Sequence, residues 1–415
     1  MYTTQLLRYY FGSTGKAYKN SYRKSINGKK YGFDEDGKML FGYVEPDTYT
    51  IIDNDQDEPI LSAEYYYGTN EDGALHTGWL QYTDALPTID DADPNETHDY
   101  YWFYFNTSNG RKVTDAKKTI NGKKYHFDTY GVMGYKWADS TYDSINMKTD
   151  TAWYGSLEDG SLAKNKWIWS KPYEDAYLDS TKEDYTNEDE RWFRTDASGN
   201  LVKNKTKKIN SKWYVFDADG VMRTGLVALS NTDGAVSGSH GVHFFDMDTV
   251  TVKDIEESSY RKQIHYFSEE EEKDGSMKTG TMSIELSDDT KTFCFDKNTG
   301  AAKDGYDSST KKIYKSGILQ KAGDDKYKVK SYTDKNGNTV DYLVGTTGNV
   351  VKAVNKYKDA NDMYYIYLKD YDVDGTTYQW VIDSTWDEDT AKKAVKDKKI
   401  ISTDHSKLFY GPEKN

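Results

Sequence analysis

The sequence predicts an all-β protein: an elongated solenoid of stacked β-hairpins with acidic loop insertions and a small mixed segment at the C-terminus. The first observation behind this prediction is a short motif that recurs along the chain, and the second is a longer spacing between its turn glycines. The third is composition, because hydrophobic residues make up 36% of the chain and aromatic residues 15%, with 38 Tyr and 10 Trp. Aromatic rings must therefore supply much of the buried apolar surface.

Three segments carry the motif most clearly, and each reads as a strand, a tight turn, an aromatic strand and a second turn ending in Gly. They are KSINGKKYGFDEDGKMLFG at 24–42, KTINGKKYHFDTYGVMGYKW at 118–137 and KINSKWYVFDADGVMRTG at 208–225. Asn27-Gly28 and Asn121-Gly122 favour a two-residue hairpin turn, because both central residues of that turn need a positive φ. In the strand that follows each turn, Tyr and Phe alternate, so one strand face is aromatic.

The motif is grouped at a longer period. Gly110 and Gly199 are as far apart as Gly131 and Gly220, which indicates a group of three hairpins duplicated across 65–137 and 153–226. The acidic insertions between hairpins are Glu45–Ala63, Gln81–Asp99, Ser170–Glu190 and Met247–Gln263. Insertions at fixed places in a repeat usually form loops on one side of the stack. A lone hairpin is marginal in water, so stability is expected to come from interfaces between neighbouring hairpins.

The strength of the motif divides the chain into three parts. Residues 1–305 form the repeat array, and residues 306–352 carry degenerate repeats with weaker strand and turn signals. Residues 353–415 form a cap or the start of a further domain. In that last part, Met363–Lys369 and Tyr378–Ile382 are predicted strands, and Asp387–Asp397 is a predicted short helix.

Composition and missing motifs exclude several classes of function. The net charge of −14 argues against nucleic acid as a partner. No apolar run is long enough to insert into a membrane, and the first residues lack the apolar core of a signal peptide. No nucleophile motif, phosphate cradle or zinc-ligand spacing occurs, so we predict a non-catalytic protein without metal or cofactor. The sequence leaves the oligomeric state open.

The pattern K-x-I-N-G-K-x-Y-x-F-D-x-x-G-x-M resembles the cell-wall-binding repeat family. That family includes choline-binding modules of Gram-positive surface proteins, glucan-binding repeats of glucosyltransferases and repetitive regions of clostridial toxins. Segments 24–43, 117–137 and 207–226 match closely, and looser copies extend the resemblance over most of residues 17–305. The resemblance implies a hairpin solenoid that is secreted or displayed at a cell surface. It does not specify the ligand, because one scaffold serves several ligands.

Two ligands remain open on this resemblance, the choline of cell-wall teichoic acid and a glycan. Relatives bind choline in cages of aromatic rings, which attract a cation, or stack such rings on sugars. Lys30 and Lys124 replace Trp in two hairpins and would repel choline there, which leaves residues 79–213 as the best place for a site. The candidate residues, expected in pairs from adjacent repeats, are Trp79, Trp102, Trp137, Trp153, Trp167, Trp192 and Trp213.

The sequence therefore supports two hypotheses of function. In the first, the chain is a non-catalytic module that attaches a protein to a Gram-positive cell wall through choline or a glycan. In the second, it is a structural stalk with degenerate sites, because large rings are also what a stack of hairpins needs for its core. An acidic surface would attract choline and repel the anionic backbone of teichoic acid.

Overall fold

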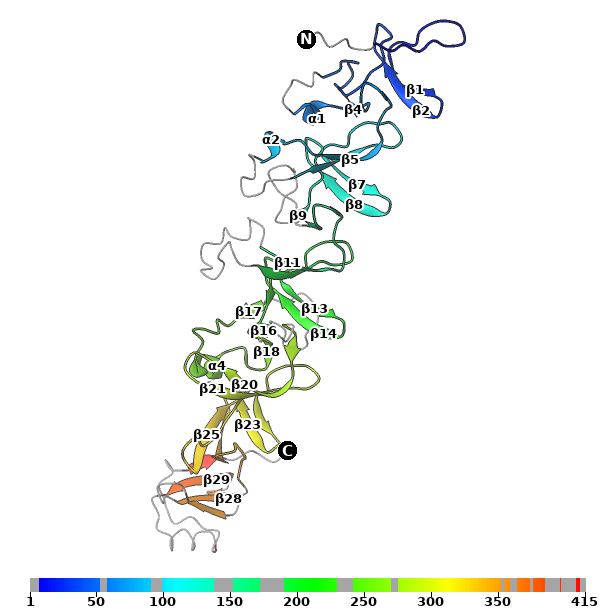
Figure 1. Cartoon of the computed structure of the whole chain (residues 1–415). Coiled ribbons are helices and arrows are strands. Elements are labelled where there is room, and N and C mark those ends of the chain that lie inside the picture. The colour runs from blue at the N-terminus through cyan, green and yellow to red at the C-terminus, as the bar shows by residue number, and fades with distance from the viewer. Residues whose placement is uncertain are drawn as a thin grey trace. The chain divides into compact units, whose positions relative to one another are not determined.

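The computed structural model describes residues 7–52, 58–90, 99–137, 152–171, 190–229, 242–269, 275–351, 355–358, 364–373, 376–384, 396 and 408–410. These residues form antiparallel hairpins and short strand pairs with few helical turns, so the all-β prediction is confirmed (Figure 1). The chain divides into two compact units, Met1–Leu201 and Val202–Asn415, called unit 1 and unit 2 below. The solenoid shape of the whole and the predicted boundaries at residues 305 and 352 stay predictions.

The elements of unit 1 are mostly strands of two to six residues. They are β1 (Ser21–Ile26), β2 (Lys29–Phe33), β3 (Tyr43–Val44), α1 (Pro59–Ser62), β4 (Tyr65–Tyr66), β5 (Gly78–Tyr82), α2 (Pro87–Asp90), β6 (Tyr101–Phe105), β7 (Ala116–Ile120), β8 (Lys123–Phe127), β9 (Lys136–Trp137), β10 (Trp153–Tyr154), β11 (Trp167–Ser170) and β12 (Arg191–Arg194). They pair antiparallel as two-stranded sheets β1–β2, β3–β4, β5–β6, β7–β8, β9–β10 and β11–β12.

Unit 2 contains larger sheets. Its elements are β13 (Lys205–Ile209), β14 (Lys212–Phe216), β15 (Met222–Arg223), β16 (Gly225–Leu229), β17 (Val242–Phe244), α4 (Val252–Glu257), η2 (Arg261–Gln263), β18 (Ile264–Phe267), β19 (Met277–Lys278), β20 (Gly280–Glu285), β21 (Thr290–Phe295), β22 (Gly305–Asp307), β23 (Lys312–Lys315), β24 (Ile318–Leu319), β25 (Tyr327–Thr333), β26 (Thr339–Gly345), β27 (Asn355–Lys358), β28 (Tyr364–Val373), β29 (Thr376–Ser384) and β30 (Leu408–Tyr410). Its sheets have the strand orders β13-β14-β15, β17-β16-β18-β19, β20-β21-β24-β23-β22, β25-β26 and β27-β28-β29-β30.

The two-residue turns form where the sequence predicts them. Asn27 and Gly28 have φ values of 48° and 82°, and Asn121 and Gly122 have values of 49° and 81°. The third copy keeps this geometry without glycine, since Ser211 has a φ of 68°. A serine in this left-handed region costs conformational energy that glycine avoids.

Backbone hydrogen bonds join successive hairpins within each unit. Leu75 N donates to Lys30 O at 2.8 Å, and Leu162 N donates to Lys124 O at the same distance. In unit 2, Ala302 N donates to Ile264 O at 2.8 Å. Each hairpin therefore satisfies polar groups of its neighbour, which is the nearest-neighbour contact expected of a repeat protein.

A second contact between hairpins places a long side chain against a turn glycine. Met133 lies so close to Gly160 that a Cβ on this glycine would be 2.3 Å from the Sδ and Cε atoms of the methionine. The same arrangement recurs at the pairs Met39–Gly73, Met222–Gly275 and Met277–Gly300. The turn glycines thus provide both a positive φ and the space that the next side chain fills.

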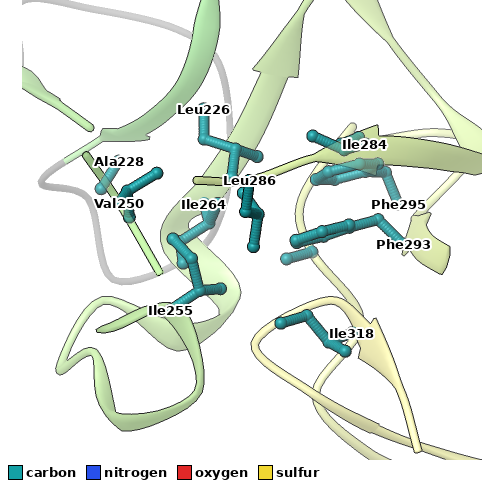
Figure 2. Packing of buried hydrophobic residues seen from close by; sticks show 11 residues of the cluster. Leu226, Ala228, Val250, Ile255, Ile264, Ile284, Leu286, Phe293, Phe295 and Ile318 are labelled. Carbon is teal, nitrogen blue, oxygen red and sulfur yellow. The ribbon is translucent and has the colours of Figure 1, made fainter. Parts of the chain in front are cut away.

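Aromatic rings are about half of the buried hydrophobic residues of unit 1 and the largest of them, as the composition predicts. The largest fully buried side chains there are Phe33, Tyr67, Tyr101, Phe103, Phe105, Phe127 and Phe193. Unit 2 mixes rings with aliphatic side chains. Figure 2 shows Leu286 between Ile264 and the rings of Phe293 and Phe295, which stack 6.0 Å apart.

The acidic insertions contain helical turns as well as loops where the structure describes them. α1 and α2 begin at Pro59 and Pro87, and proline is preferred in the first turn of a helix. α4 begins after Thr251, whose side chain forms a reciprocal capping box with Asp254. Ile255 of α4 is fully buried in the core of unit 2, so this insertion adds to the core.

The last part of the chain is strand-rich. β28 contains the predicted strand Met363–Lys369 except for Met363, which lies outside the described residues, and β29 contains the predicted strand Tyr378–Ile382; both extend further towards the C-terminus. The predicted helix at Asp387–Asp397 lies outside the described residues except for Lys396. In the described part of the chain, no helix is long and apolar enough to cross a membrane.

Candidate ligand-binding site

Two sheets of unit 1 hold matching pairs of tryptophans on neighbouring strands. Trp79 of β5 and Trp102 of β6 have ring centroids 6.2 Å apart and ring planes at 85°. Trp167 of β11 and Trp192 of β12 have centroids 6.1 Å apart, also at 85°. The equal geometry shows that the two sheets place their indoles in the same way.

The first pair is enclosed by other aromatic rings. Trp79 lies 5.1 Å from Tyr104, 4.9 Å from Tyr125 and 5.7 Å from Phe127, measured between ring centroids. The indole Nε1 of Trp102 is buried and has no hydrogen-bond partner among the described residues. Both tryptophans pack on the core of this region, so their rings serve the stack itself.

The second pair has a cation where the first has a tyrosine. Tyr104 is opposite Trp79 in the strand register, and Arg194 is opposite Trp167. The guanidinium carbon of Arg194 lies 5.6 Å from the centroid of the Trp167 ring, within cation–π range. Burial lowers the pKa of Arg194, but arginine stays charged at any physiological pH. The positively charged guanidinium of Arg194 therefore already lies over the ring of Trp167.

A third pair joins β9 and β10. The centroids of Trp137 and Trp153 are 4.9 Å apart, and Trp137 lies equally close to Phe193. Trp137 Nε1 donates to Lys171 O at 2.8 Å. Trp213 differs from the other six candidates, because it lies in unit 2, packs on a cluster of Val215, Val227, Leu229 and Phe267, and has its ring centroid 5.9 Å from Lys208 Nζ. It has no described tryptophan as a partner.

A pocket of about 540 Å³ opens beside the second and third pairs, and we call it the tryptophan pocket. Three indoles line it, those of Trp153, Trp167 and Trp169. The other lining side chains used below are Lys123, Lys124, Asp159, Lys164 and Lys166. Its volume lies in the range of sites for small molecules, and its mixture of rings and polar groups is typical of such sites.

Trp169 is absent from the seven sequence candidates. Its side chain is 49% exposed, and its Nε1 donates to Glu190 Oε2 at 2.6 Å. The ring of Trp192, which is 41% exposed, lies 5.0 Å from it. The signal was present in the sequence, because Trp167-Ile168-Trp169 alternates and so places both indoles on one face of a strand.

The described residues that line the tryptophan pocket carry more positive than negative charge, although the chain as a whole is acidic. Lys123 Nζ pairs with Asp159 Oδ1 at 2.7 Å, and the hydrogen bond from Lys123 lowers the pKa of Asp159. The ammonium groups of Lys124, Lys164 and Lys166 are exposed and have no ion-pair or hydrogen-bond partner among the described residues. Four lysines thus face one lining carboxylate.

The described residues offer no group of three His, Cys, Asp or Glu side chains that could hold a metal ion. Cys294 lies between Phe293 and Phe295 in the sequence of β21 and is buried against Tyr314 and Leu319, where it packs as a small residue. The rings and polar groups that line the tryptophan pocket can stack on and hydrogen-bond a ligand.

The fold and the paired indoles define a β-hairpin repeat protein with aromatic surfaces between neighbouring hairpins. Residues 118–133 and 207–222 match the family model described as a putative cell wall binding repeat. The chain thus contains cell wall binding repeats, which confirms the family resemblance predicted from its sequence. Repeats of this kind are binding modules.

Several solved structures from Streptococcus pneumoniae are similar to this chain. The modular autolysin LytC has 15% sequence identity over 77% of this chain, with a TM-score of 0.38, and the match spans 52% of LytC. CbpJ has 17% identity over 83% of this chain and 100% of its own, with a TM-score of 0.39. Choline binding protein F has 17% identity over 84% of this chain and 100% of its own, with a TM-score of 0.37. No curated protein matches the sequence.

Proposed function

We propose that this chain is a non-catalytic module that binds a cell-wall glycan through the tryptophan pocket. The observation that carries the proposal is the set of three indoles, Trp153, Trp167 and Trp169, on the wall of one open pocket. Indole faces stack on the apolar faces of sugar rings, and the neighbouring polar groups can hydrogen-bond sugar hydroxyls. The match to cell wall binding repeats supports the wall as the source of the ligand.

The charge at the pocket favours a glycan over choline. A quaternary ammonium entering the pocket would meet the ammonium groups of Lys124, Lys164 and Lys166, and Arg194 is already on Trp167. Like charges repel, which offsets the attraction between a cation and an aromatic face. A sugar carries no positive charge and avoids this cost.

A wall ligand also implies a location. The cell wall lies outside the cytoplasmic membrane, so we propose that the chain acts as part of a secreted or surface protein of a Gram-positive bacterium. The similar choline-binding proteins named above come from such an organism.

The alternative is a structural stalk, and one observation favours it. Trp79 packs against the rings of Tyr104, Tyr125 and Phe127. These rings fill the positions around the indole that a ligand would need. A chain in which every indole were enclosed in this way would need no ligand. Trp169 and Trp192 depart from that arrangement because both are exposed.

The test is sedimentation of the full chain with purified Gram-positive cell walls, one preparation with choline on its teichoic acid and one without. Glycan binding predicts that both preparations sediment the chain and that free choline does not release it. Trp169→Ala should weaken sedimentation, whereas Tyr306→Ala, at an exposed ring of unit 2, should not. Sedimentation only with choline-bearing walls would favour a choline cage, and none with either would favour the stalk.

A further inference from the structure

We propose that the tryptophan pocket selects glycans that carry a negative charge, as a carboxylate or a phosphate on or beside the sugar ring. This inference rests on the proposed function and names the class of its ligand. The chain has a net charge of −14, yet Lys123, Lys124, Lys164 and Lys166 line one pocket together with three indoles. A cluster of lysines on an otherwise acidic protein creates a local positive potential. Such a potential favours negatively charged ligands.

Among the described residues, the carboxylates at the pocket do not cancel its positive charge. Asp159 Oδ1 is 2.7 Å from Lys123 Nζ, and its Oδ2 accepts from Ser161 Oγ at 2.9 Å. Glu190, near the rim, accepts from the indole of Trp169. In the described part of the chain, one lining carboxylate, Asp159, and one bonded to a lining indole, Glu190, thus stand against four lysines and Arg194. Lys124, Lys164 and Lys166 form no ion pair or side-chain hydrogen bond with the described residues and remain available to an anion, although the charge of Lys166 also lowers the pKa of Asp159.

Backbone hydrogen bonds hold the segments that carry these lysines. Lys124 O accepts from Leu162 N at 2.8 Å, which joins the 116–127 hairpin to the next one. Lys166 O accepts from Thr195 N at 3.0 Å, and Lys166 N donates to Thr195 Oγ1 at 3.1 Å. Ala163 N donates to Trp153 O at 2.8 Å. The two sides of the pocket are therefore placed before a ligand arrives, which reduces the entropy lost on binding.

The equivalent position in the earlier hairpins, between the Lys29–Lys30 turn and Trp79, has fewer lysines than the tryptophan pocket. There Lys29 pairs with Asp72 at 2.8 Å, as Lys123 pairs with Asp159, and Lys30 O accepts from Leu75 N. The residues just before Trp79 are Thr77 and Gly78, whereas Lys164 and Lys166 precede Trp167. The additional lysines thus belong to the second sheet, where the exposed indoles are.

Lysine suits an anion presented at varied angles. Its ammonium is a compact charge on a flexible stem, so it pairs with a carboxylate or a phosphate without demanding one geometry. The indoles would hold the sugar ring while the lysines hold its charged group. Because the lysines are exposed, the charge contribution is screened by salt, whereas the stacking contribution is not.

The experiment measures the affinity of the full chain by tryptophan fluorescence for three probes at low and high salt. Hexagalacturonate supplies carboxylates on a sugar chain, phosphorylated chitohexaose supplies phosphates on a sugar chain, and chitohexaose itself is uncharged. We expect at least one anionic probe to bind about tenfold more tightly than chitohexaose at low salt, with the difference largely lost at high salt. The anionic probe that binds identifies the charged group.

Two double variants separate local charge from total charge. Lys164→Ala with Lys166→Ala should lower the affinity for the anionic probe about tenfold and lower that for chitohexaose by much less, because the neutral sugar loses no charge pairing. Lys29→Ala with Lys30→Ala removes the same charge at the corresponding hairpin and should leave both affinities within about twofold. All four lysines are partly or fully exposed, so neither variant should affect folding.

The failures of the two proposals differ. Equal affinity for charged and uncharged probes, or an anionic preference that survives the Lys164/Lys166 change, overturns the charge selection. If chitohexaose binding is then still weakened by Trp169→Ala, the proposed glycan site stands. Binding of none of the three probes overturns both.

Discussion

Replacing Gly160 by alanine tests the contact that repeats between successive hairpins. Gly160 has a φ of 57°, a region that costs an alanine about 1–2 kcal/mol relative to its ordinary conformations. The new Cβ would lie 2.3 Å from Sδ and Cε of Met133, a side chain that is 3% exposed. Overpacking of this kind costs about 1–3 kcal/mol, because a buried neighbour must shift. The expected loss of unfolding free energy is the sum of these two costs, about 2–5 kcal/mol.

Gly28→Ala is the matched control. Gly28 has a φ of 82°, but an added Cβ would have no atom within 4 Å, so only the conformational cost applies. The assay is urea denaturation of the full chain followed by tryptophan fluorescence, which reports mainly on unit 1 because seven of the ten tryptophans lie there. Gly160→Ala should be more destabilising than Gly28→Ala by the overpacking cost, about 1–3 kcal/mol.

A double-mutant cycle with Met133→Ala isolates the contact. Met133→Ala alone should cost about 2–5 kcal/mol through the cavity that it leaves. In the Met133→Ala background, the alanine at position 160 no longer overpacks, so Gly160→Ala should cost only its conformational energy. The coupling free energy between the two changes should therefore be about 1–3 kcal/mol. Additive effects of the two changes, or equal costs for Gly160→Ala and Gly28→Ala, would refute the packing argument.

Three further predictions concern single residues. Ser211→Gly should stabilise unit 2 by about 0.5–1 kcal/mol in urea denaturation, because Ser211 has a φ of 68° in a turn whose other copies use glycine, and an unchanged midpoint would contradict this. Thr251→Ala should remove the capping box of α4 and cost about 1 kcal/mol, seen as faster hydrogen exchange of the Val252–Glu257 amides while β13 and β14 exchange as before. Burial lowers the pKa of Lys112 to about 8, so the unfolded chain binds more protons between pH 8 and 10.5, and stability should rise with pH in that window by roughly 3 kcal/mol from this residue. Lys112→Met should remove that part of the rise, and equal pH profiles for the two proteins would show that Lys112 is not the cause.

The hairpins could be predicted because their signals are local. The turn at Asn121-Gly122 and the alternation of Tyr125 and Phe127 are read within a few residues, and neighbouring copies support one another. The helix α4 could also have been found, since Thr251 and Asp254 have the spacing of a capping box inside a segment predicted as a loop. The segment Met247–Gln263 was instead predicted as a loop because it is acidic and lies between two hairpins.

The pocket could be predicted only in part, because it depends on contacts distant in sequence. Trp153 and Trp167 were among the candidates, but the lysines beside them come from two hairpins that are distant in sequence. The net charge of the chain is negative, so it predicts an acidic binding surface and not a pocket lined by lysines. The position of Arg194 on Trp167 follows from the register of β11 and β12, which the sequence does not specify. The ligand roles of the seven candidate tryptophans stay predictions.

The most direct measurement of the central claim is a titration of the full chain with soluble cell-wall glycan fragments, followed by NMR of the indole N–H signals. Tryptophan-to-phenylalanine variants would assign each signal. Glycan binding in the tryptophan pocket predicts saturable shifts for Trp153, Trp167 and Trp169 and none for Trp213 in unit 2. Unmoved signals for all three pocket indoles, with fragments that compete for wall binding, would contradict the account.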